Sequence, residues 1–343
     1  MSTTLRLAGF AIALGLLPTV SASAQGKLNI YCAANQEWCQ AITNEFTKRT
    51  GIDAAFTRKG SGETFAQIRA EKDNPKGDIV WGGTGDPQLQ AAEEKLTLAY
   101  ESPLLKDLQP WAQEQWKRGS KRTVGIYLGV IGFVYNEEQM AKRKLAPPAC
   151  WADLIKPEYK GEVQMPNPHS SGTGYTTVAT LVQLWGEDKA FDYIKRLHGN
   201  VNQYTKQGPA PGMAAARGET LIAITFLHDG VMNALRGFPV KGVAPCEGTG
   251  YEIGSMSIID GARNLANAKK FYDFALSPEG QTTAVKGESY QTPSNRGTPV
   301  PKESPDATKF KLIDYDFAKY GSSAERRRLL GKWSEEIKVG APQ

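Results

Sequence analysis

The feature of this sequence that most constrains its fold is a repeated alternation of short apolar strand patterns with longer helical patterns. Strands are expected at 27–32, 52–56, 77–83, 123–135, 162–165 and 221–226, and helices at 38–49, 64–71 and 174–184. Such alternation is typical of α/β folds, in which crossover helices cover a largely parallel sheet. The sequence therefore predicts an α/β protein.

Residues 1–24 have the pattern of a secretory signal peptide. Arg6 supplies a positive start, residues 7–18 form an apolar run, and Ala22-Ser23-Ala24 provides the small residues of a cleavage site before Gln25. The run is shorter than the roughly 20 residues that a membrane-spanning helix needs. A retained anchor is the alternative. We expect the protein to be exported to the periplasm.

The remaining 319 of the 343 residues exceed what one hydrophobic core usually holds. Two long extended runs, at 124–133 and 251–258, could each carry the chain between two lobes. They predict a discontinuous lobe 1 at 25–126 plus 253–343 and a lobe 2 at 127–252, an arrangement that suits hinged closure. The charged tail at 306–339 is expected to be a helical cap, with Arg326-Arg327-Arg328 on its solvated face.

The cysteines and the charge limit the classes of partner. Cys32, Cys39, Cys150 and Cys246 form an even set, which in an oxidising compartment indicates disulfides. Because Cys32 and Cys39 are close in sequence, we expect Cys32–Cys39 and Cys150–Cys246. A metal site is disfavoured, since no Cys-x-x-Cys spacing occurs and the three histidines are scattered. The formal charge of +5 is spread without a basic block, which argues against nucleic acid and slightly favours an anionic ligand.

Three loops that combine glycine with hydroxyl residues stand where strands lead into helices. They contribute Ser61, Thr84, and the run Ser171, Gly172, Thr173. Backbone N–H groups and hydroxyls at helix N-termini can hold an anion, although each loop alone could be an ordinary turn or helix cap. None matches the nucleotide-binding P-loop pattern. Together they predict an anion site.

A second polar group follows the buried strand at 221–226. His228 and Asp229 stand at its end, and Glu252 lies on the second extended run. A carboxylate with a neutral imidazole matches sugar hydroxyls, which both donate and accept hydrogen bonds. The alternatives are a helix N-cap for Asp229, a buried structural His228 and a hinge salt bridge for Glu252. Asn35, Tyr204 and Thr205 are further candidate contacts.

These stretches resemble the periplasmic hexose-phosphate-binding proteins, a branch once labelled as ferric-iron-binding proteins. The likeness spans the mature chain and is most specific in Leu-His-Asp at 227–229 and Cys-Glu-Gly-Thr-Gly-Tyr-Glu at 246–252. It is also carried by 30–32, 60–62, 81–84 and 312–317.

The resemblance implies a two-lobed, type II periplasmic binding protein, each lobe a mixed sheet flanked by helices, with the ligand in the cleft between them. It implies a monomer without catalytic activity or cofactor that passes hexose phosphates resembling glucose 6-phosphate to ABC transporter permease subunits. The family's His-Asp pair and later Glu hold the sugar and match His228, Asp229 and Glu252. Its phosphate loops match Ser61, Thr84 and Ser171 to Thr173.

Three other functions are alternatives to this one. The related iron-binding proteins use consecutive tyrosines for hard ferric ion, and this sequence has no Tyr-Tyr pair. A phosphonate ligand stays open, because the anion loops would serve it equally. A periplasmic hydrolase using His228 and Asp229 is disfavoured, because no nucleophile elbow or paired-metal motif accompanies them.

Overall fold

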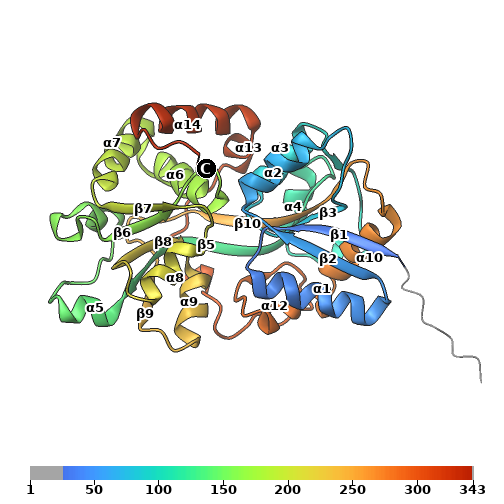
Figure 1. Ribbon diagram of the computed structural model, residues 1–343, viewed down its shortest axis with the longest axis horizontal. Coiled ribbons are helices and arrows are strands. Elements are labelled where there is room, and N and C mark those ends of the chain that lie inside the picture. The colour runs from blue at the N-terminus through green and yellow to red at the C-terminus, as the bar shows by residue number, and fades with distance from the viewer. Residues whose placement is uncertain (1–25, 342–343) are drawn as a thin grey trace, which may run out of the picture.

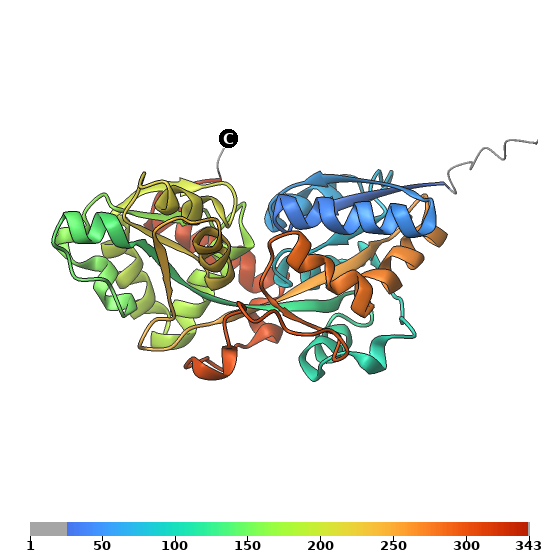
Figure 2. The same cartoon turned by 90° about the horizontal axis from the view of Figure 1, so that it is seen from below.

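Two antiparallel strands join the two halves of the molecule. They are β5 (Val124–Asn136) and β10 (Tyr251–Ile259), which correspond to the two extended runs predicted from the sequence. In a computed structural model that describes residues 26–341, they run side by side between two lobes (Figures 1 and 2). The expected signal peptide at 1–24 lies outside the described residues. This two-lobed α/β architecture agrees with the expected type II binding-protein fold.

The first lobe is a mixed sheet covered by helices on both sides (Figure 1). Its strands follow the order β2-β1-β3-β10-β5, in which β1 pairs parallel with β2 and β3, and β10 pairs antiparallel with β3 and β5. The elements are β1 (Lys27–Cys32), α1 (Gln36–Thr50), β2 (Asp53–Arg58), α2 (Ser61–Ala70), β3 (Ile79–Trp81), α3 (Asp86–Glu93), β4 (Thr97–Leu98), α4 (Pro110–Arg118), α10 (Leu265–Leu276), α11 (Pro278–Gln281), α12 (Thr283–Lys286) and β11 (Thr292–Pro293).

The second lobe continues the same path of strands beyond β5, in the order β5-β8-β6-β7. The second half of β5 pairs antiparallel with β8 and β9, and β6 pairs parallel with β7 and β8. The elements are α5 (Glu137–Lys142), β6 (Val163–Pro166), α6 (Gly172–Trp185), α7 (Glu187–His198), β7 (Val201–Thr205), α8 (Ala210–Ala216), β8 (Ile222–Phe226), α9 (Leu227–Leu235) and β9 (Val240–Val243).

Each lobe has its own large hydrophobic cluster. In the first lobe Leu28, Phe46 and Trp81 pack with Phe271 of the returning chain. In the second lobe the cluster is built on β5, β8 and α6 around Trp151. Within residues 26–341, no helix combines the length and the apolar character needed to cross a bilayer.

The C-terminal helices depart from the expectation that all of 253–343 would complete the first lobe. Leu329 and Trp333 of α14 (Ser323–Glu336) are fully buried in the same cluster as Trp151, and α14 lies over α6 and α7 in Figure 1. The preceding α13 (Phe317–Tyr320) joins this cluster as well. We therefore propose that residues 317–337 belong with the second lobe; the other lobe boundaries stay as predicted.

Two details of the tail were predicted wrongly. Much of 306–316 is irregular and not helical. Arg326 is not on a solvated face, since it is only 5% exposed. Its guanidinium lies 4.4 Å from the centre of the Tyr175 ring and donates a hydrogen bond to the Pro168 carbonyl, which compensates for its burial. Arg327 and Arg328 are exposed, as expected.

Both expected disulfides are present. Cys32–Cys39 joins the end of β1 to α1, and Cys150–Cys246 closes a long loop in the second lobe, with sequence separations of 7 and 96 residues. The described residues contain no free cysteine.

Candidate ligand-binding site

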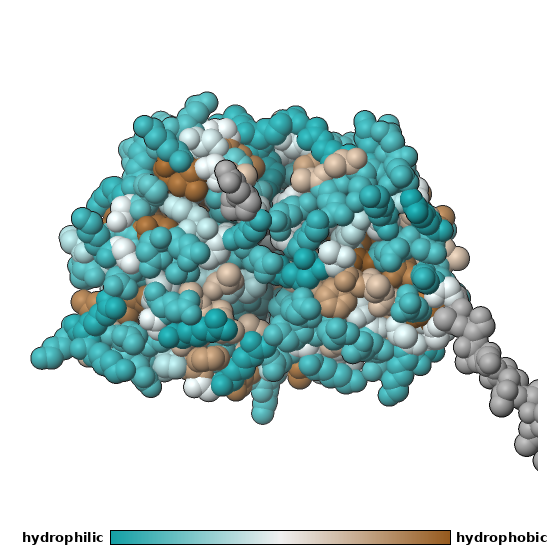
Figure 3. All heavy atoms as spheres, viewed as in Figure 1, coloured by the Kyte–Doolittle hydropathy of each residue, from teal (hydrophilic) through white to brown (hydrophobic). Residues whose placement is uncertain are grey.

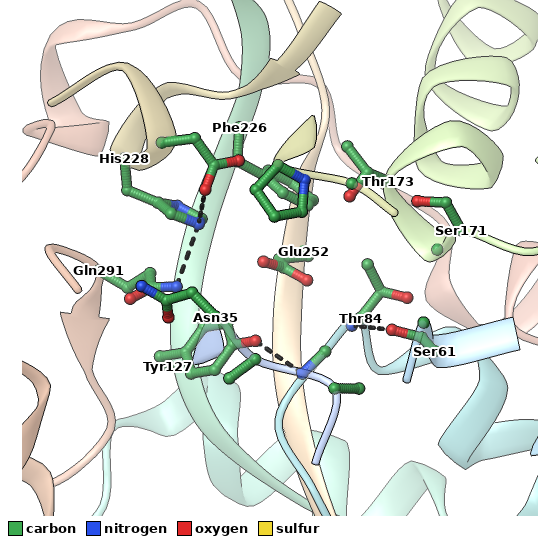
Figure 4. Close-up of a pocket in the computed structure, with 18 of the residues that line it drawn as sticks. Asn35, Ser61, Thr84, Tyr127, Ser171, Thr173, Phe226, His228, Glu252 and Gln291 are labelled. Atoms are coloured by element: carbon green, nitrogen blue, oxygen red, sulfur yellow. Dashed lines mark hydrogen bonds and ion pairs between the residues drawn. The ribbon is translucent and has the colours of Figure 1, made fainter. Parts of the chain in front are cut away.

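A pocket lies between the lobes, where the two crossing strands meet the loops of both sheets (Figure 4). It holds about 460 Å³ of space not filled by atoms, including its opening to solvent. Figure 3 shows the surface hollowed between the lobes. The pocket brings together the following predicted residues: Ser61, Thr84, Ser171, Gly172, Thr173, His228, Asp229, Glu252 and Asn35.

One end of the pocket is formed by hydroxyl groups and helix N-termini. Ser61 is the first residue of α2, and Ser171 is the N-cap of α6. The Ser61 hydroxyl accepts a hydrogen bond of 3.1 Å from the backbone N–H of Thr84, whose own hydroxyl is buried without a partner. Figure 4 shows Ser61, Thr84, Ser171 and Thr173 gathered at this end. Two positive helix ends and several donors make it suitable for an anion.

The two lobes approach each other closely at this end. Gly172 opens α6 in the second lobe, and a Cβ atom on it would overlap the side chain of Thr84 from the first lobe. A larger residue at 172 would hold the anion loops apart. Glycine there allows hydroxyls from both lobes to converge on one ligand group.

Arg58 is a pocket residue that the sequence reading missed. It ends β2, two residues before the Gly60-Ser61 loop, and its Nε donates to the Ala34 carbonyl at 3.0 Å. Its Nη1 is buried without a partner. Burial lowers the pKa of this guanidinium, while the negative charges of Asp229 and Glu63 oppose that shift. A cation at the end of a strand beside an anion loop is a signal that could have identified it.

The other end of the pocket carries carboxyl and imidazole groups. His228 and Asp229 stand in the first turn of α9, and Glu252 projects from β10 toward the middle of the pocket (Figure 4). Asp229 Oδ2 accepts a hydrogen bond of 2.6 Å from the Thr225 hydroxyl. The His228 ring stacks on Phe226 with centroids 5.3 Å apart and an angle of 9° between the planes.

Burial sets the protonation of this end. It lowers the pKa of His228 although Asp229 acts in the opposite direction, so the imidazole is neutral at pH 7. Glu252 is 4% exposed, and burial, helped by the nearby carboxylates of Asp229 and Asp86, raises its pKa well above the ordinary value. The imidazole and the carboxyl groups together offer donors and acceptors to a polar ligand.

Two candidate contacts do not reach the pocket. The Tyr204 hydroxyl lies 2.8 Å from His198 Nδ1, and the Tyr204 ring packs against Trp333. The Thr205 hydroxyl donates to the Gln207 carbonyl. Both hydroxyls therefore have partners within the second lobe, and neither residue is among those that line the pocket. Tyr127 and Gln291 line the pocket instead.

Potential metal ligands cluster elsewhere. Among the described residues, the one group that could hold a metal ion is Cys150, Cys246 and Glu247, and its two cysteines are joined in a disulfide.

Comparison with known proteins places this chain in a family. The family model described as bacterial extracellular solute-binding protein matches residues 74–320. An uncharacterized protein of Haemophilus influenzae is 46% identical over 330 residues, covering 96% of this chain and 95% of that protein.

Two solved structures are similar throughout. The periplasmic binding protein AfuA from Actinobacillus pleuropneumoniae, solved with exogenous fructose 6-phosphate bound, is 50% identical with a TM-score of 0.90, over 92% of this chain and 100% of that one. The periplasmic binding protein P5PA is 41% identical with a TM-score of 0.88, over 91% and 100%. The chain described here thus belongs to the bacterial extracellular solute-binding proteins.

Proposed function

We propose that this protein is the periplasmic receptor of an ABC importer for hexose phosphates. The observation that carries the proposal is the division of the pocket into an anion-binding end and an end of buried carboxyl and imidazole groups. A phosphorylated sugar has the same division, with a compact dianion at one end and hydroxyls at the other. The hexose phosphate bound in the similar AfuA structure supports this choice.

The phosphate would occupy the end formed by Ser61, Thr84 and the Ser171 to Thr173 run. The partnerless Thr84 hydroxyl and the N–H groups of Gly172 and Thr173, which have no partner within α6, would be available to its oxygens. The partnerless Nη1 of Arg58 adds a cation within the same pocket. Buried donors without partners cost free energy, so a ligand that satisfies them binds favourably.

The sugar ring would lie against His228, Asp229 and Glu252. A hydroxyl can donate to a carboxylate and accept from an imidazole at once, whereas the ammonium of an aminoalkyl phosphonate only donates. The mixture of donors and acceptors at this end therefore favours a polyhydroxylated ring over a phosphonate with one amine. The planar Phe226–His228 stack adds an apolar wall of the kind that sugar rings pack against.

In this proposal the chain binds its ligand without converting it. Contacts across the cleft suit a receptor that closes on its ligand, since Arg236 of α9 pairs with Glu37 of α1 at 2.8 Å and also with Glu288. The closed monomer would then deliver the ligand to permease subunits in the inner membrane. Incubation with sugar phosphate should release no inorganic phosphate; steady release would indicate a hydrolase.

The deciding experiment is calorimetric titration of the refolded, ligand-free mature protein. Glucose 6-phosphate and fructose 6-phosphate are titrated, with glucose, inorganic phosphate, 2-aminoethylphosphonate and ferric ion as controls. We expect tight binding of at least one hexose phosphate and weaker binding of every control. Tight binding of the phosphonate or of iron, with none of the hexose phosphates, would overturn the proposed substrate.

A further inference from the structure

The two ring nitrogens of His228 have different surroundings. Nε2 lies 3.1 Å from Nε2 of the Gln291 side-chain amide, whereas the nearest oxygen of Asp229, Oδ1, is 3.8 Å away. Only the first distance is within hydrogen-bonding range. Nδ1 is buried and has no partner (Figure 4 shows His228 and Gln291 joined). Gln291, which the sequence reading did not select, is therefore the direct partner of this histidine.

The orientation of the Gln291 amide gives the direction of that hydrogen bond. Its NH₂ group faces His228, while its Oε1 accepts a hydrogen bond from the Ser289 hydroxyl. An amide NH₂ can only donate. Nε2 of His228 must then accept, and because the buried imidazole is neutral, its single proton is on Nδ1.

Nδ1 and Glu252 border the same small space. A Cβ atom placed on Gly129 of β5 would lie 3.0 Å from His228 Nδ1 and 3.1 Å from Glu252 Oε1. Glycine at this position avoids a close contact with both side chains, which line the pocket. A ligand oxygen within reach of both groups would accept from Nδ1–H and donate to the Glu252 carboxyl group, which is the pattern of one hydroxyl.

From this geometry we infer that Gln291 is a positioning residue that fixes His228 as the Nδ1–H tautomer and so makes the imidazole a donor toward the ligand. Gln291 directly precedes β11, and β11 pairs with Leu128 and Tyr127 of β5. This pairing holds the Gln291 backbone, and with it the side-chain amide, beside a strand that joins the lobes. The ligand's identity rests on the proposed function, but the tautomer does not. An opposite tautomer would present a lone pair beside the carboxyl groups and would favour a ligand donor instead of an acceptor.

The test is nitrogen NMR of the ligand-free protein labelled with ¹⁵N-histidine. The chain has three histidines, and the His228 signals are identified by their loss in His228→Gln. We expect a pyrrole-like Nδ1 and a pyridine-like Nε2 in the wild type. Gln291→Glu should move the proton to Nε2 or charge the ring, and Gln291→Leu should give a mixture of tautomers.

A matched control is Gln281→Leu, which removes another buried glutamine whose amide donates to Ser294 at 2.6 Å, away from His228. It should leave the His228 signals unchanged. A wild-type ring protonated at Nε2, or the same tautomer in wild type and both Gln291 variants, would overturn the inference.

Binding provides the second measurement. Gln291→Leu should weaken hexose-phosphate binding by about tenfold or more while leaving inorganic phosphate binding unchanged; equal weakening of both ligands would contradict a role at the sugar end. If the expected tautomer is found but no hexose phosphate binds, the proposed function fails and the assignment of Gln291 stands.

Discussion

Replacing Asp229 by asparagine tests the sugar end of the pocket with almost no change in side-chain shape. Asp229 is 5% exposed, and Oδ2 is engaged by the Thr225 hydroxyl, which leaves Oδ1 to face the pocket. Asparagine can keep the bond to Thr225 through its amide oxygen. It then presents NH₂ where the carboxylate offered an acceptor, so a ligand hydroxyl meets a donor.

The expected loss follows from the type of hydrogen bond. A hydrogen bond to a charged group contributes about 1.5–3 kcal/mol, which corresponds to roughly 10- to 150-fold in the dissociation constant. Asp229→Ala should lose affinity in the same range, because it leaves the ligand hydroxyl without its acceptor, while Thr225 can still donate to the Gly208 carbonyl at 3.1 Å. Neither change should alter binding of inorganic phosphate, which lacks the ring.

Calorimetric titration of wild type and variants with hexose phosphate and with inorganic phosphate measures both effects. Asp316→Asn is the control, since Asp316 is an N-cap outside the pocket that accepts from the Lys319 N–H at 2.9 Å. Thermal unfolding checks that each variant is folded. A folded Asp229→Asn protein that binds hexose phosphate within about threefold of wild type would remove Asp229 from the sugar site.

Three other perturbations test the rest of the site and the fold. Thr84→Val should weaken all phosphorylated ligands by about tenfold without changing the ratio between two hexose phosphates; a change in that ratio alone would contradict the division of the pocket. Because burial raises the pKa of Glu252, the unfolded chain releases this proton at lower pH than the folded protein, so stability falls as pH rises above the ordinary glutamate value. Glu252→Gln in the ligand-free protein should therefore melt higher than wild type at pH 8 and alike at pH 4, and a difference that is constant across pH would refute this. Replacing both cysteines of Cys150–Cys246 by serine should lower the free energy of unfolding by about 4–5 kcal/mol, and the same change at Cys32–Cys39 by about 2–3 kcal/mol, since the first disulfide closes the longer loop. Equal shifts of the denaturant midpoint in the two variants would contradict an origin in loop length.

The sequence was informative wherever the signal is local. Apolar alternation identified the strands, and glycine with hydroxyl residues at strand ends identified Ser61, Thr84 and Ser171 as pocket residues. His228 and Glu252 were found because they follow or lie on strands recognisable by pattern. Parallel strands collect such loops at one edge of a sheet, so local patterns carry over to the pocket.

Apart from Arg58, whose place beside the Gly60-Ser61 loop is a local signal, the omissions and differences depend on contacts between distant segments. Gln291 enters the pocket because β11 pairs with β5, a contact over more than 160 residues that no local pattern indicates. Tyr204 precedes a Gly-Pro turn, but its ring packs on Trp333 from the far end of the chain. Arg326 looked solvated because its neighbours are charged, whereas the tail's packing on Tyr175 depends on which lobe receives it.

The position of α14 affects the order in which this chain can fold. The second lobe needs Trp333 of α14 for its core, and the first needs Phe271 of the returning chain, so the first lobe cannot finish packing before α10 is made and the second cannot before α14 is made. Most multidomain chains fold their N-terminal domain first as it emerges. Here the first core waits for the segment that returns after the second lobe, and the second core waits for the last helix. Late completion of the cores suits a chain with the signal peptide expected at 1–24, because a chain whose cores are unfinished can still be threaded through a membrane pore.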